Sequence, residues 1–469
     1  MLSSITQYFS ASSMETFISN LRPKLSDSAR ILTPSDPDFI AANERWTDID
    51  RKIPAVIVQP ACENDIVKLV QAAHAAKVPF IPTTGGHSSW STIHNGMVID
   101  LSHFKDVAVD TNQHLVTVRG GVLMKELQIA LGEKNQFTTV ANGSTVGVIP
   151  YMIGGGISSY TPLIGYACEN ILSARIVVAS GDIVVASEAE NSDLLWAIRG
   201  AGQFFGLVTE LVLRTHDPSL MGPDGVRQLG NIFFPPERAS EVCSVLRDVV
   251  SANDHASAGH FMAMNDPSKG RILMVAAQYF GTGPELQATY QPVIDLDPLN
   301  HFHEPSTFEK HSDHLAWMCP KGEFKRFSQT GLASINPENF GRLVDLHREL
   351  LETLPGTERS VFTIEWHTKT PSDGPRKTKT SFGLKNIDTW LNILTWYTDP
   401  ALHEKVLQFD KRAQEIMRSD TEENAFVSYT NTSRSDPIEH RYKDAAAVRK
   451  LKELKQIWDS EGCFTEEFL

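Results

Sequence analysis

The sequence has little cysteine and no long apolar segment. Only five cysteines occur in 469 residues, and no two of them form a C-x-x-C pair. An odd number of scattered cysteines disfavours a disulfide framework and is most simply explained by a reducing compartment. No run approaches the roughly 18 consecutive apolar residues of a membrane span, and the N-terminal segment lacks the basic and apolar regions of a secretory signal. We therefore expect a soluble, cytoplasmic protein without a membrane partner.

Positive charge is also in short supply. Lysine and arginine total 43 against 57 aspartate and glutamate residues, which gives a net charge of -14 at pH 7. The charges are scattered, so the basic surface that binds nucleic acid is not expected. The histidines are dispersed without the spacing of a metal site, and no metal is expected. With 41% hydrophobic residues, the chain is long enough to bury large cores in two or three domains.

Several common catalytic motifs are absent. The sequence has no Gly-x-Ser-x-Gly elbow, no phosphate-binding P-loop and no Gly-x-Gly-x-x-Gly run that opens a helix. A Rossmann-type dinucleotide site would need the last of these directly after a strand, with an acidic residue about 20 positions further on. Hydrolase-elbow, P-loop and Rossmann chemistry are therefore not expected.

A glycine-rich segment of another kind is present at the end of a predicted strand. It reads Pro82-Thr-Thr-Gly-Gly-His-Ser-Ser89. The glycine pair lets backbone N–H groups approach an anion closely, and Ser88 and Ser89 add hydroxyl donors. His87 projects a nucleophilic imidazole from the same loop. Taken alone, the segment is equally compatible with a turn that holds a structural histidine.

Two further glycine-rich blocks lie downstream, at Asn142–Gly156 and Asp193–Gly206, and the second leads into a strand pattern at 208–213. Together with the His87 loop, they resemble the flavin domain of the vanillyl-alcohol-oxidase superfamily, the PCMH-type FAD-binding domain. The resemblance is strongest to the berberine-bridge-enzyme-like branch, which includes many fungal oxidoreductases. It covers roughly residues 45–215 and returns near the C-terminus.

The resemblance implies that the cofactor is FAD, linked covalently from the ring nitrogen of His87 to the flavin 8α-methyl group. It also implies a set of cofactor contacts: Thr84, Gly85, Gly86, Ser88, Ser89, Gly143, Ser144, Val146, Gly147, Gly154, Gly155, Gly156 and Asn431. Many relatives form a second flavin bond through a cysteine in a Cys-Pro-Thr-Val-Gly segment. This chain reads Gly-Ser-Thr-Val-Gly at 143–147. With no thiol in that segment, we expect a single link, through His87 only.

The resemblance also bears on the reaction with oxygen. Val146 occupies the position where, in plant relatives, a small residue admits dioxygen and a larger one obstructs it. This favours an oxidase over a dehydrogenase. The expected function is an FAD-linked oxidase that transfers a hydride from a small-molecule alcohol, amine or secondary-metabolite intermediate to flavin N5, with O2 as acceptor. The alternative is a flavin-retaining scaffold that catalyses a cyclisation without net redox chemistry.

The expected fold class is α+β: a two-subdomain PCMH-type FAD-binding domain, with a substrate cap of antiparallel sheet backed by helices. The expected division is a helical lead-in at 1–45, the FAD-binding domain at 46–218, the cap at 219–420 and a C-terminal return segment at 421–469. Local patterns predict strands at 54–59, 272–280, 360–366 and 391–397, and helices at 63–76, 237–252, 337–354 and 400–419.

The reaction needs a base that removes a proton from an O–H or N–H group beside the carbon that loses the hydride. A buried Tyr, Glu or Asp would serve. Tyr429 is the leading candidate, because the Tyr-x-Asn motif places it near the flavin ring. Glu365 and Tyr397 on predicted cap strands follow, and then Tyr279 and His367. For each one, packing in the core or facing solvent is the competing interpretation.

Overall fold

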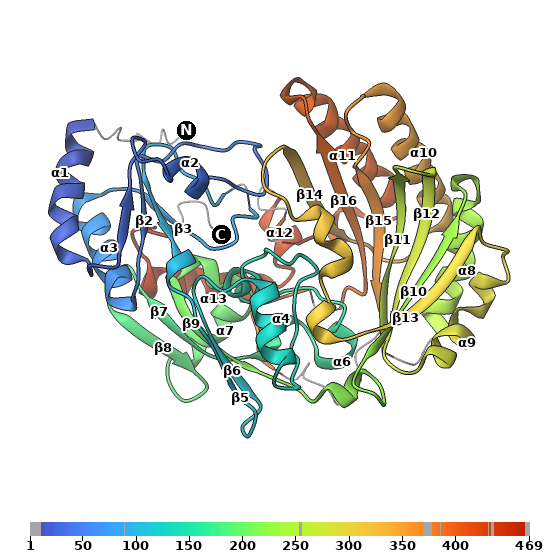
Figure 1. Ribbon diagram of the computed structural model, residues 1–469, viewed down its shortest axis with the longest axis horizontal. Helices are drawn as coiled ribbons and strands as arrows, with labels where there is room; N and C mark the ends of the chain where they lie inside the picture. Colours follow the sequence, from blue (N-terminus) through green and yellow to red (C-terminus); the bar gives the residue numbers. More distant parts are fainter. Residues whose placement is uncertain are drawn as a thin grey trace.

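The structure is a computed structural model that describes residues 11–88, 90–252, 256–368, 378–384, 386–429, 431–432 and 436–464. Ser89, an expected cofactor contact, lies outside the described residues. The described chain forms two halves that lie side by side (Figure 1). The left half in that view contains the glycine-rich blocks, and the right half is built on one large antiparallel sheet.

A four-stranded sheet opens the first half. Its order is β1 (Arg30–Leu32), β2 (Val56–Gln59), β4 (Met97–Asp100) and β3 (Phe80–Thr83). β2, β4 and β3 run parallel, and β1 adds an antiparallel edge strand. Every side chain of β2 and β4 is buried, as expected of parallel strands covered on both faces. The segment expected to be a helical lead-in contains the helices Ala11–Leu21 and Phe39–Ala42, and it also contributes β1 to the sheet.

Helix α3 (Glu63–Ala76) connects β2 to β3 and has the bounds that the sequence pattern predicts. It begins where Asp65 accepts a hydrogen bond from the backbone N–H of Cys62 at 3.2 Å. It ends at Lys77, whose φ of 53° is left-handed. Its apolar face recurs at helical spacing and is buried: Ile66, Leu69, Val70 and Ala73. Helix α1 (Ala11–Leu21) packs against it.

A five-stranded antiparallel sheet forms the second part of this half. Its order is β5 (Val107–Asp110), β6 (Leu115–Arg119), β9 (Leu207–Arg214), β7 (Ile171–Val177) and β8 (Ile183–Ser187). Helices α4 (Met124–Gly132), α5 (Val148–Ile153) and α7 (Ser192–Ala201) pack against its strands. The two sheets confirm the expected two-subdomain FAD-binding architecture.

The second half is an eight-stranded antiparallel sheet, which confirms the expected cap. Its order is β13 (Asn300–Ser306), β10 (Arg227–Phe234), β12 (Gly270–Tyr279), β11 (Ser257–Asp266), β15 (Val361–His367), β16 (Thr389–Tyr397), β14 (Phe324–Gly331) and β17 (Val427–Ser428). Helices α8 (Ala239–Ala252), α9 (Gly283–Ile294), α10 (Pro337–Thr353) and α11 (His403–Met417) cover one face (Figure 1). The other face is turned toward the FAD-binding half. Side chains of each strand alternate between the two faces.

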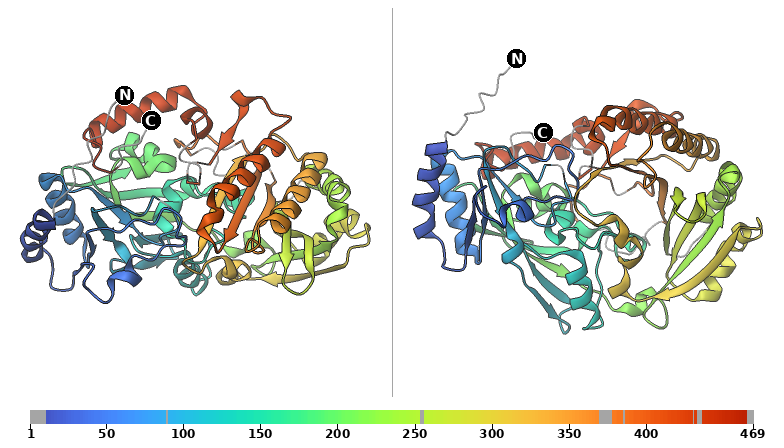
Figure 2. Two further views of the ribbon diagram at one scale, coloured as in Figure 1. Left: turned by 90° about the horizontal axis from the view of Figure 1, so that it is seen from above. Right: turned by 45° about the horizontal axis from the view of Figure 1, so that its top comes forward.

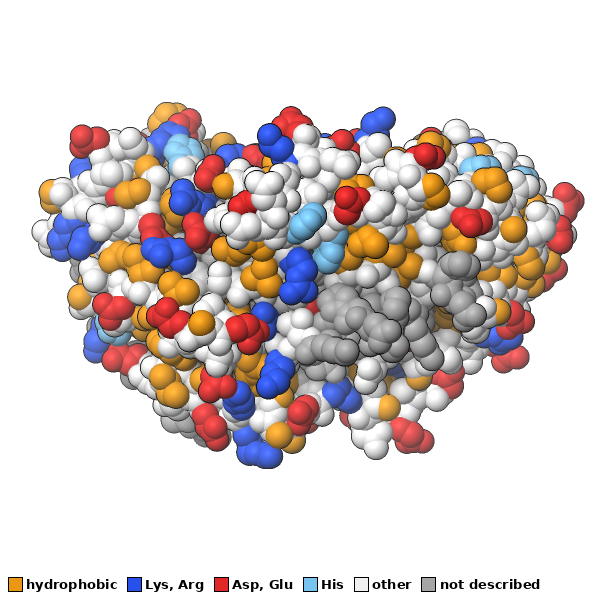
Figure 3. All heavy atoms as spheres, turned by 90° about the horizontal axis from the view of Figure 1, so that it is seen from below, with side chains coloured by type: hydrophobic (Ala, Val, Ile, Leu, Met, Phe, Trp, Pro, Cys, Tyr) orange, Lys and Arg blue, Asp and Glu red, His pale blue; other side chains and the backbone are white. Residues whose placement is uncertain are grey.

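The C-terminal segment joins the two halves. β17 pairs with β14 at the edge of the cap sheet, and helix α13 (Ala445–Trp458) then packs against α7 of the FAD-binding half. Figure 2 shows α13, in red, lying over that half. Acidic and basic side chains are interspersed over the face shown in Figure 3. Among the described helices, none is long and apolar enough to cross a membrane.

Candidate cofactor and active site

A cavity of about 900 Å³ lies between the two halves. One wall consists of the His87 loop and of segments around 141–153 in the FAD-binding half. The facing wall is the open face of the cap sheet, and the C-terminal segment closes one end with Tyr429 and Asn431. Both expected parts of the site, the cofactor loops and the cap, therefore face one shared space.

The His87 loop is held by backbone-to-backbone packing. A Cβ atom at Gly85 would lie 2.2 Å from the carbonyl oxygen of Thr145 and 2.7 Å from the backbone nitrogen of Gly147. Gly86 has a φ of +66°, a left-handed conformation that favours glycine. Thr84, Gly85, Gly86, His87 and Ser88 all line the cavity. Gly85 is thus required by the close approach of the 143–147 segment, and Gly86 by its own backbone conformation.

His87 is oriented by its neighbours. Its Nε2 lies 2.7 Å from Thr145 Oγ1, and its ring stacks on Trp46 with the centroids 5.6 Å apart. Burial, reinforced by the positive charges of Lys325 and Lys321, lowers the pKa of His87 to about 3. The imidazole is therefore neutral at physiological pH, the form that acts as a nucleophile.

A cysteine from a distant part of the chain lies beside the segment at 143–147. Gly143, Val146 and Gly147 line the cavity, whereas the Ser144 hydroxyl turns to Cys319 Sγ at 3.3 Å. Cys319 follows the short helix η8 (Asp313–Met318), and its Sγ lies 4.0 Å from the position that a Cβ at Gly143 would take. The segment itself has no thiol, as the sequence indicates, but the tertiary structure brings one beside it.

The triple glycine at 154–156 seats the C-terminal segment. A Cβ at Gly154 would lie 2.1 Å from Asn431 Nδ2, and the N–H of Gly156 donates to the Tyr429 hydroxyl at 3.0 Å. Gly155 has a φ of +110° and packs on Phe382. These glycines are not among the described residues that line the cavity. Because these glycines have no Cβ atom, the Asn431 and Tyr429 side chains, which do line the cavity, fit beside them.

The hydrogen bonds that the Tyr429 hydroxyl accepts leave it as a donor at the cavity wall. Its hydroxyl oxygen accepts from Gly156 N–H at 3.0 Å and from Asn431 Nδ2 at 3.1 Å. Burial raises its pKa above the ordinary value, which keeps the phenol neutral. With both lone pairs engaged, the hydroxyl can donate its own proton but is poorly suited to accept one.

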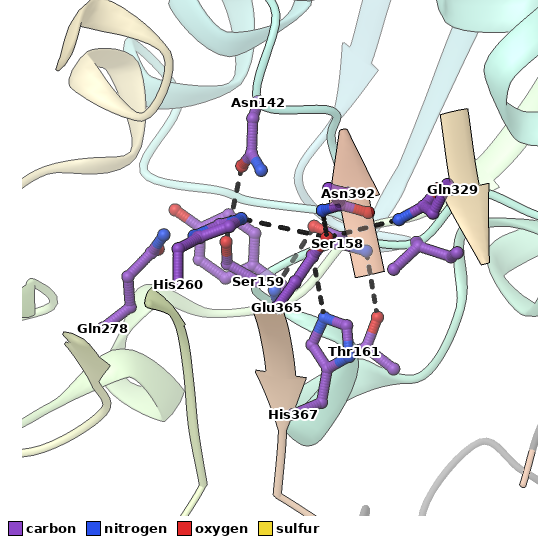
Figure 4. Close-up of polar contacts among 12 residues, drawn as sticks. Asn142, Ser158, Ser159, Thr161, His260, Gln278, Gln329, Glu365, His367 and Asn392 are labelled. Carbon is purple, nitrogen blue, oxygen red and sulfur yellow. Dashed lines mark hydrogen bonds and ion pairs between the residues drawn. The ribbon is translucent and has the colours of Figure 1, made fainter. Parts of the chain in front are cut away.

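A buried polar cluster stands on the facing wall (Figure 4). Glu365 on β15 lies directly opposite His260 on β11 in the sheet register. Its Oε2 accepts from Asn392 Nδ2 at 2.5 Å and from Gln329 Nε2 at 3.2 Å, and it lies 3.8 Å from His260 Nε2. His367 Nε2 lies 3.3 Å from the other carboxylate oxygen. Glu365, His260, Asn392 and Gln329 line the cavity.

The two titratable groups Glu365 and His260 differ in charge at neutral pH. Burial by itself would raise the pKa of Glu365, but His367, His260 and Asn392 outweigh it and lower the pKa to about 2. Burial lowers the pKa of His260, and the neighbouring Glu365 charge only partly offsets this. At neutral pH the arrangement is therefore a carboxylate beside an uncharged imidazole that faces the cavity.

The remaining sequence candidates lie elsewhere. Tyr397 and Tyr279 belong to the opposite face of the cap sheet, where they pack in the core beneath the helices. The Tyr397 hydroxyl contacts His403 Nδ1 at 2.5 Å. His260, Gln329 and Asn392 are not predicted as site residues from the sequence. Alternation of polar and apolar residues on their strands is a signal for one exposed face, but only strand register shows that they meet at Glu365.

The residues present fit an FAD molecule. Gly85 and Gly86 of the His87 loop line the cavity, and glycine lets backbone N–H groups approach a diphosphate closely. Within the described part of the chain, Thr83 Oγ1, Gln203 Oε1 and Asn392 Oδ1 are buried atoms of cavity-lining residues without a protein hydrogen-bond partner. Groups of this kind suit a ligand with many polar atoms.

Known proteins agree with this assignment. A family model described as an FAD binding domain matches residues 54–187. The chain is 27% identical over 457 residues to the FAD-linked oxidoreductase hasG of Aspergillus fumigatus, an alignment that covers 92% of this chain and 95% of that protein.

Solved structures share the whole fold. The berberine-bridge-enzyme-like protein 1 of Physcomitrella patens superposes with a TM-score of 0.82 at 17% identity, over 96% of this chain and 97% of that one. The chain therefore contains an FAD binding domain, is similar to FAD-linked oxidoreductases of fungi, and shares the fold of a berberine-bridge-enzyme-like protein. Glucooligosaccharide oxidase from Acremonium strictum, whose FAD is described as 6-S-cysteinyl and 8α-N1-histidyl, superposes with a TM-score of 0.80 at 18% identity, over 96% and 98% of the two chains.

His87→Ala should abolish covalent attachment of FAD, because it removes the neutral imidazole that faces the cavity. Denatured wild-type protein should stay yellow and carry the flavin mass on the peptide that contains His87. His103→Ala, a change at an exposed histidine, is the control and should keep the bound flavin. Complete release of flavin from denatured wild-type protein would contradict the link. Mass analysis of the same peptide reports whether Cys319 is also attached.

Tyr429→Phe should lower the free energy of unfolding by about 1–3 kcal/mol, because it leaves the Gly156 N–H and the Asn431 amide without their acceptor. Urea unfolding of holoenzyme measures this change. Flavin reduction should slow by less than the roughly 100-fold expected for loss of a base. Tyr397→Phe, on the helical side of the cap sheet, should leave flavin reduction unchanged. A loss well beyond 100-fold in Tyr429→Phe would return the base to Tyr429.

Proposed function

We propose that the protein is an oxidase, which takes a hydride and a proton from a small-molecule alcohol, amine or secondary-metabolite intermediate and uses O2 as the final acceptor. The observation that carries the proposal is the His260–Glu365 pair, which faces the His87 loop across one cavity. A carboxylate behind a neutral imidazole is an arrangement suited to proton removal. The oxidase activity named for the structural relative from Acremonium strictum supports the same reaction class.

The roles of the side chains follow from their protonation states. His260 accepts the proton from the substrate O–H or N–H group, and the charge of Glu365 stabilises the imidazolium that forms. Asn392 and Gln329 hold the carboxylate in place through its Oε2. The Tyr429 hydroxyl orients the substrate by donating a hydrogen bond. FAD held by the His87 loop would supply the hydride acceptor, and O2 would take up the two electrons and two protons removed from the substrate to give hydrogen peroxide.

His260→Gln should slow anaerobic flavin reduction by about 100-fold or more, as expected for loss of a general base. Protonation removes the acceptor, so the wild-type rate should stay constant above about pH 6.5 and fall below it, through the lowered pKa of His260. Glu365, His367, His311, His314 and Arg227 are the charged or titratable groups that share electrostatic interactions with this imidazole or its neighbours.

The variants separate the base from its partner. Glu365→Gln should keep a fall in rate at low pH but lower the maximal rate, whereas His260→Gln should lose that fall. His103→Gln, at an exposed position, should keep both the rate and its pH dependence. A wild-type pH profile retained in His260→Gln would remove this residue from the mechanism. Product formation with the flavin band unbleached under anaerobic conditions would support the non-redox cyclase instead.

Val146→Leu should slow reoxidation of the reduced enzyme by O2 several-fold while leaving anaerobic reduction nearly unchanged. Val146 lines the cavity beside Gly143, with its Cγ2 only 3.0 Å from the position that a Cβ on that glycine would take, so a longer side chain fills the wall at this point. Stopped-flow mixing of reduced enzyme with O2 measures the step. Val184→Leu, on β8 away from the cavity, is the matched control. Equal reoxidation rates in Val146→Leu and wild type would exclude Val146 as the oxygen gate.

A further inference from the structure

The cavity-facing side of the cap sheet changes from polar to apolar along its strands. The first row contains His260 opposite Glu365. The second row, two residues further along each strand, is Met262, Thr363, Asn392 and Gln329, paired in that order. The third row is Val361, Leu394 and Phe327, also paired in that order. Each step of two residues is about 7 Å.

The third row has no side chain that can form a hydrogen bond, and its surroundings extend the apolar surface. Met264 and Met274 line the cavity from the neighbouring strands, and Trp317 lies 40% exposed at the wall, stacked on Trp396. Phe327 itself is 37% exposed. Apolar area left open on this scale inside a cavity is typical of a ligand-binding surface.

The cations near this end are already engaged by the protein. The Lys325 amine lies 5.0 Å and 4.6 Å from the rings of Trp46 and Trp396 and donates to the Pro320 carbonyl. Arg326 Nε contacts Asp410 Oδ2 at 2.6 Å. The Lys325 amine is thus held by two rings and a carbonyl, and the Arg326 charge is paired with a carboxylate.

The polar row lies at the Tyr429 end of the cavity. Trp390 pairs with Glu365 in the sheet, and its ring lies 6.2 Å from that of Tyr429. The apolar row lies toward Trp46, which forms one core cluster with Val361, Leu394 and Trp396 and stacks on His87. A ligand that spans the sheet rows therefore has one end among hydrogen-bonding groups and the other among aliphatic and aromatic side chains.

We infer that the substrate is an elongated, largely apolar molecule whose reacting O–H or N–H group is at one end, beside His260, and whose apolar remainder lies along the third row. Only the assignment of the reacting group rests on the proposed function; the apolar remainder is inferred from the third row. An oligosaccharide, the kind of substrate named for the relative from Acremonium strictum, carries hydroxyl groups along its whole length. Hydroxyls buried against the third row would lose their water without gaining a partner.

The test uses a series of 4-alkoxyacetophenones, from methoxy to octyloxy, as ligands that the holoenzyme cannot oxidise. Binding is followed by perturbation of the flavin absorption spectrum. The affinity should rise by about fourfold for each added methylene until the apolar end is filled. Cellobiose, the disaccharide comparison, should show no saturable binding over the same concentration range. A series with constant affinity, or tighter binding of cellobiose than of the octyloxy ketone, would overturn the inference.

Two variants place the tail on the sheet. Met264→Gln and Phe327→Gln should each weaken binding of the octyloxy ketone by about tenfold, the loss expected when part of the apolar tail meets a polar group, and leave the methoxy ketone unchanged. Ile183→Gln, an exposed apolar residue of β8, is the control with no effect on either ligand. Equal losses for both ketones would show that the tail does not lie on the third row.

The matching 4-alkoxybenzyl alcohols distinguish this inference from the proposed function. If the ketones show the chain-length dependence but none of the alcohols reduces the flavin anaerobically, the substrate shape stands and the oxidase proposal fails. If the alcohols reduce the flavin with no dependence on chain length in either series, the oxidase proposal stands and the substrate shape is wrong.

Discussion

Close backbone contact between two glycine-containing loops is the constraint on which the site depends. Gly85 approaches Thr145 and Gly147 so closely that no Cβ atom fits between them. The same contact brings the Thr145 hydroxyl to His87 Nε2 and so sets the orientation of the imidazole. A larger residue at position 85 would separate the loops and move the histidine that the cofactor wall is built around. The shape of this cavity wall therefore depends first on backbone packing, and the polar contacts depend on that packing.

A second glycine contact joins the two halves of the molecule. The 154–156 segment makes room for Asn431 and donates a backbone hydrogen bond to Tyr429, and the Tyr429 ring meets Trp390 of the cap sheet. The C-terminal segment thus contacts both walls at one end of the cavity. A short series of buried contacts therefore holds the cap sheet in position relative to the cofactor loops.

Alternation along the cap strands divides their side chains by role. Residues such as Phe362 and Tyr397 face the helices and form the core, whereas the residues between them face the cavity. On the cavity face, a buried carboxylate is tolerated because Asn392, Gln329 and two imidazoles surround it. The hydrogen-bonding groups are gathered in the first two rows of the sheet, which leaves the third row apolar. The polar groups proposed to remove the proton and the apolar row proposed to hold the rest of the substrate are therefore separated by only a few residues along each strand.

Local sequence patterns predict the individual elements and the cofactor loop. Helix α3 follows from helical spacing and capping within a short segment, β15 lies within one residue of its predicted bounds, and the glycine-rich blocks around His87 carry the family resemblance. Three features depended on the tertiary structure. β1 joins a sheet by pairing Arg30 with Gln59, 29 residues away, Cys319 reaches Gly143 from another half of the molecule, and His260 meets Glu365 through strand register. The physical reason is that period-two alternation shows which side chains share a face, but a pairing between distant strands is decided by packing of the whole sheet.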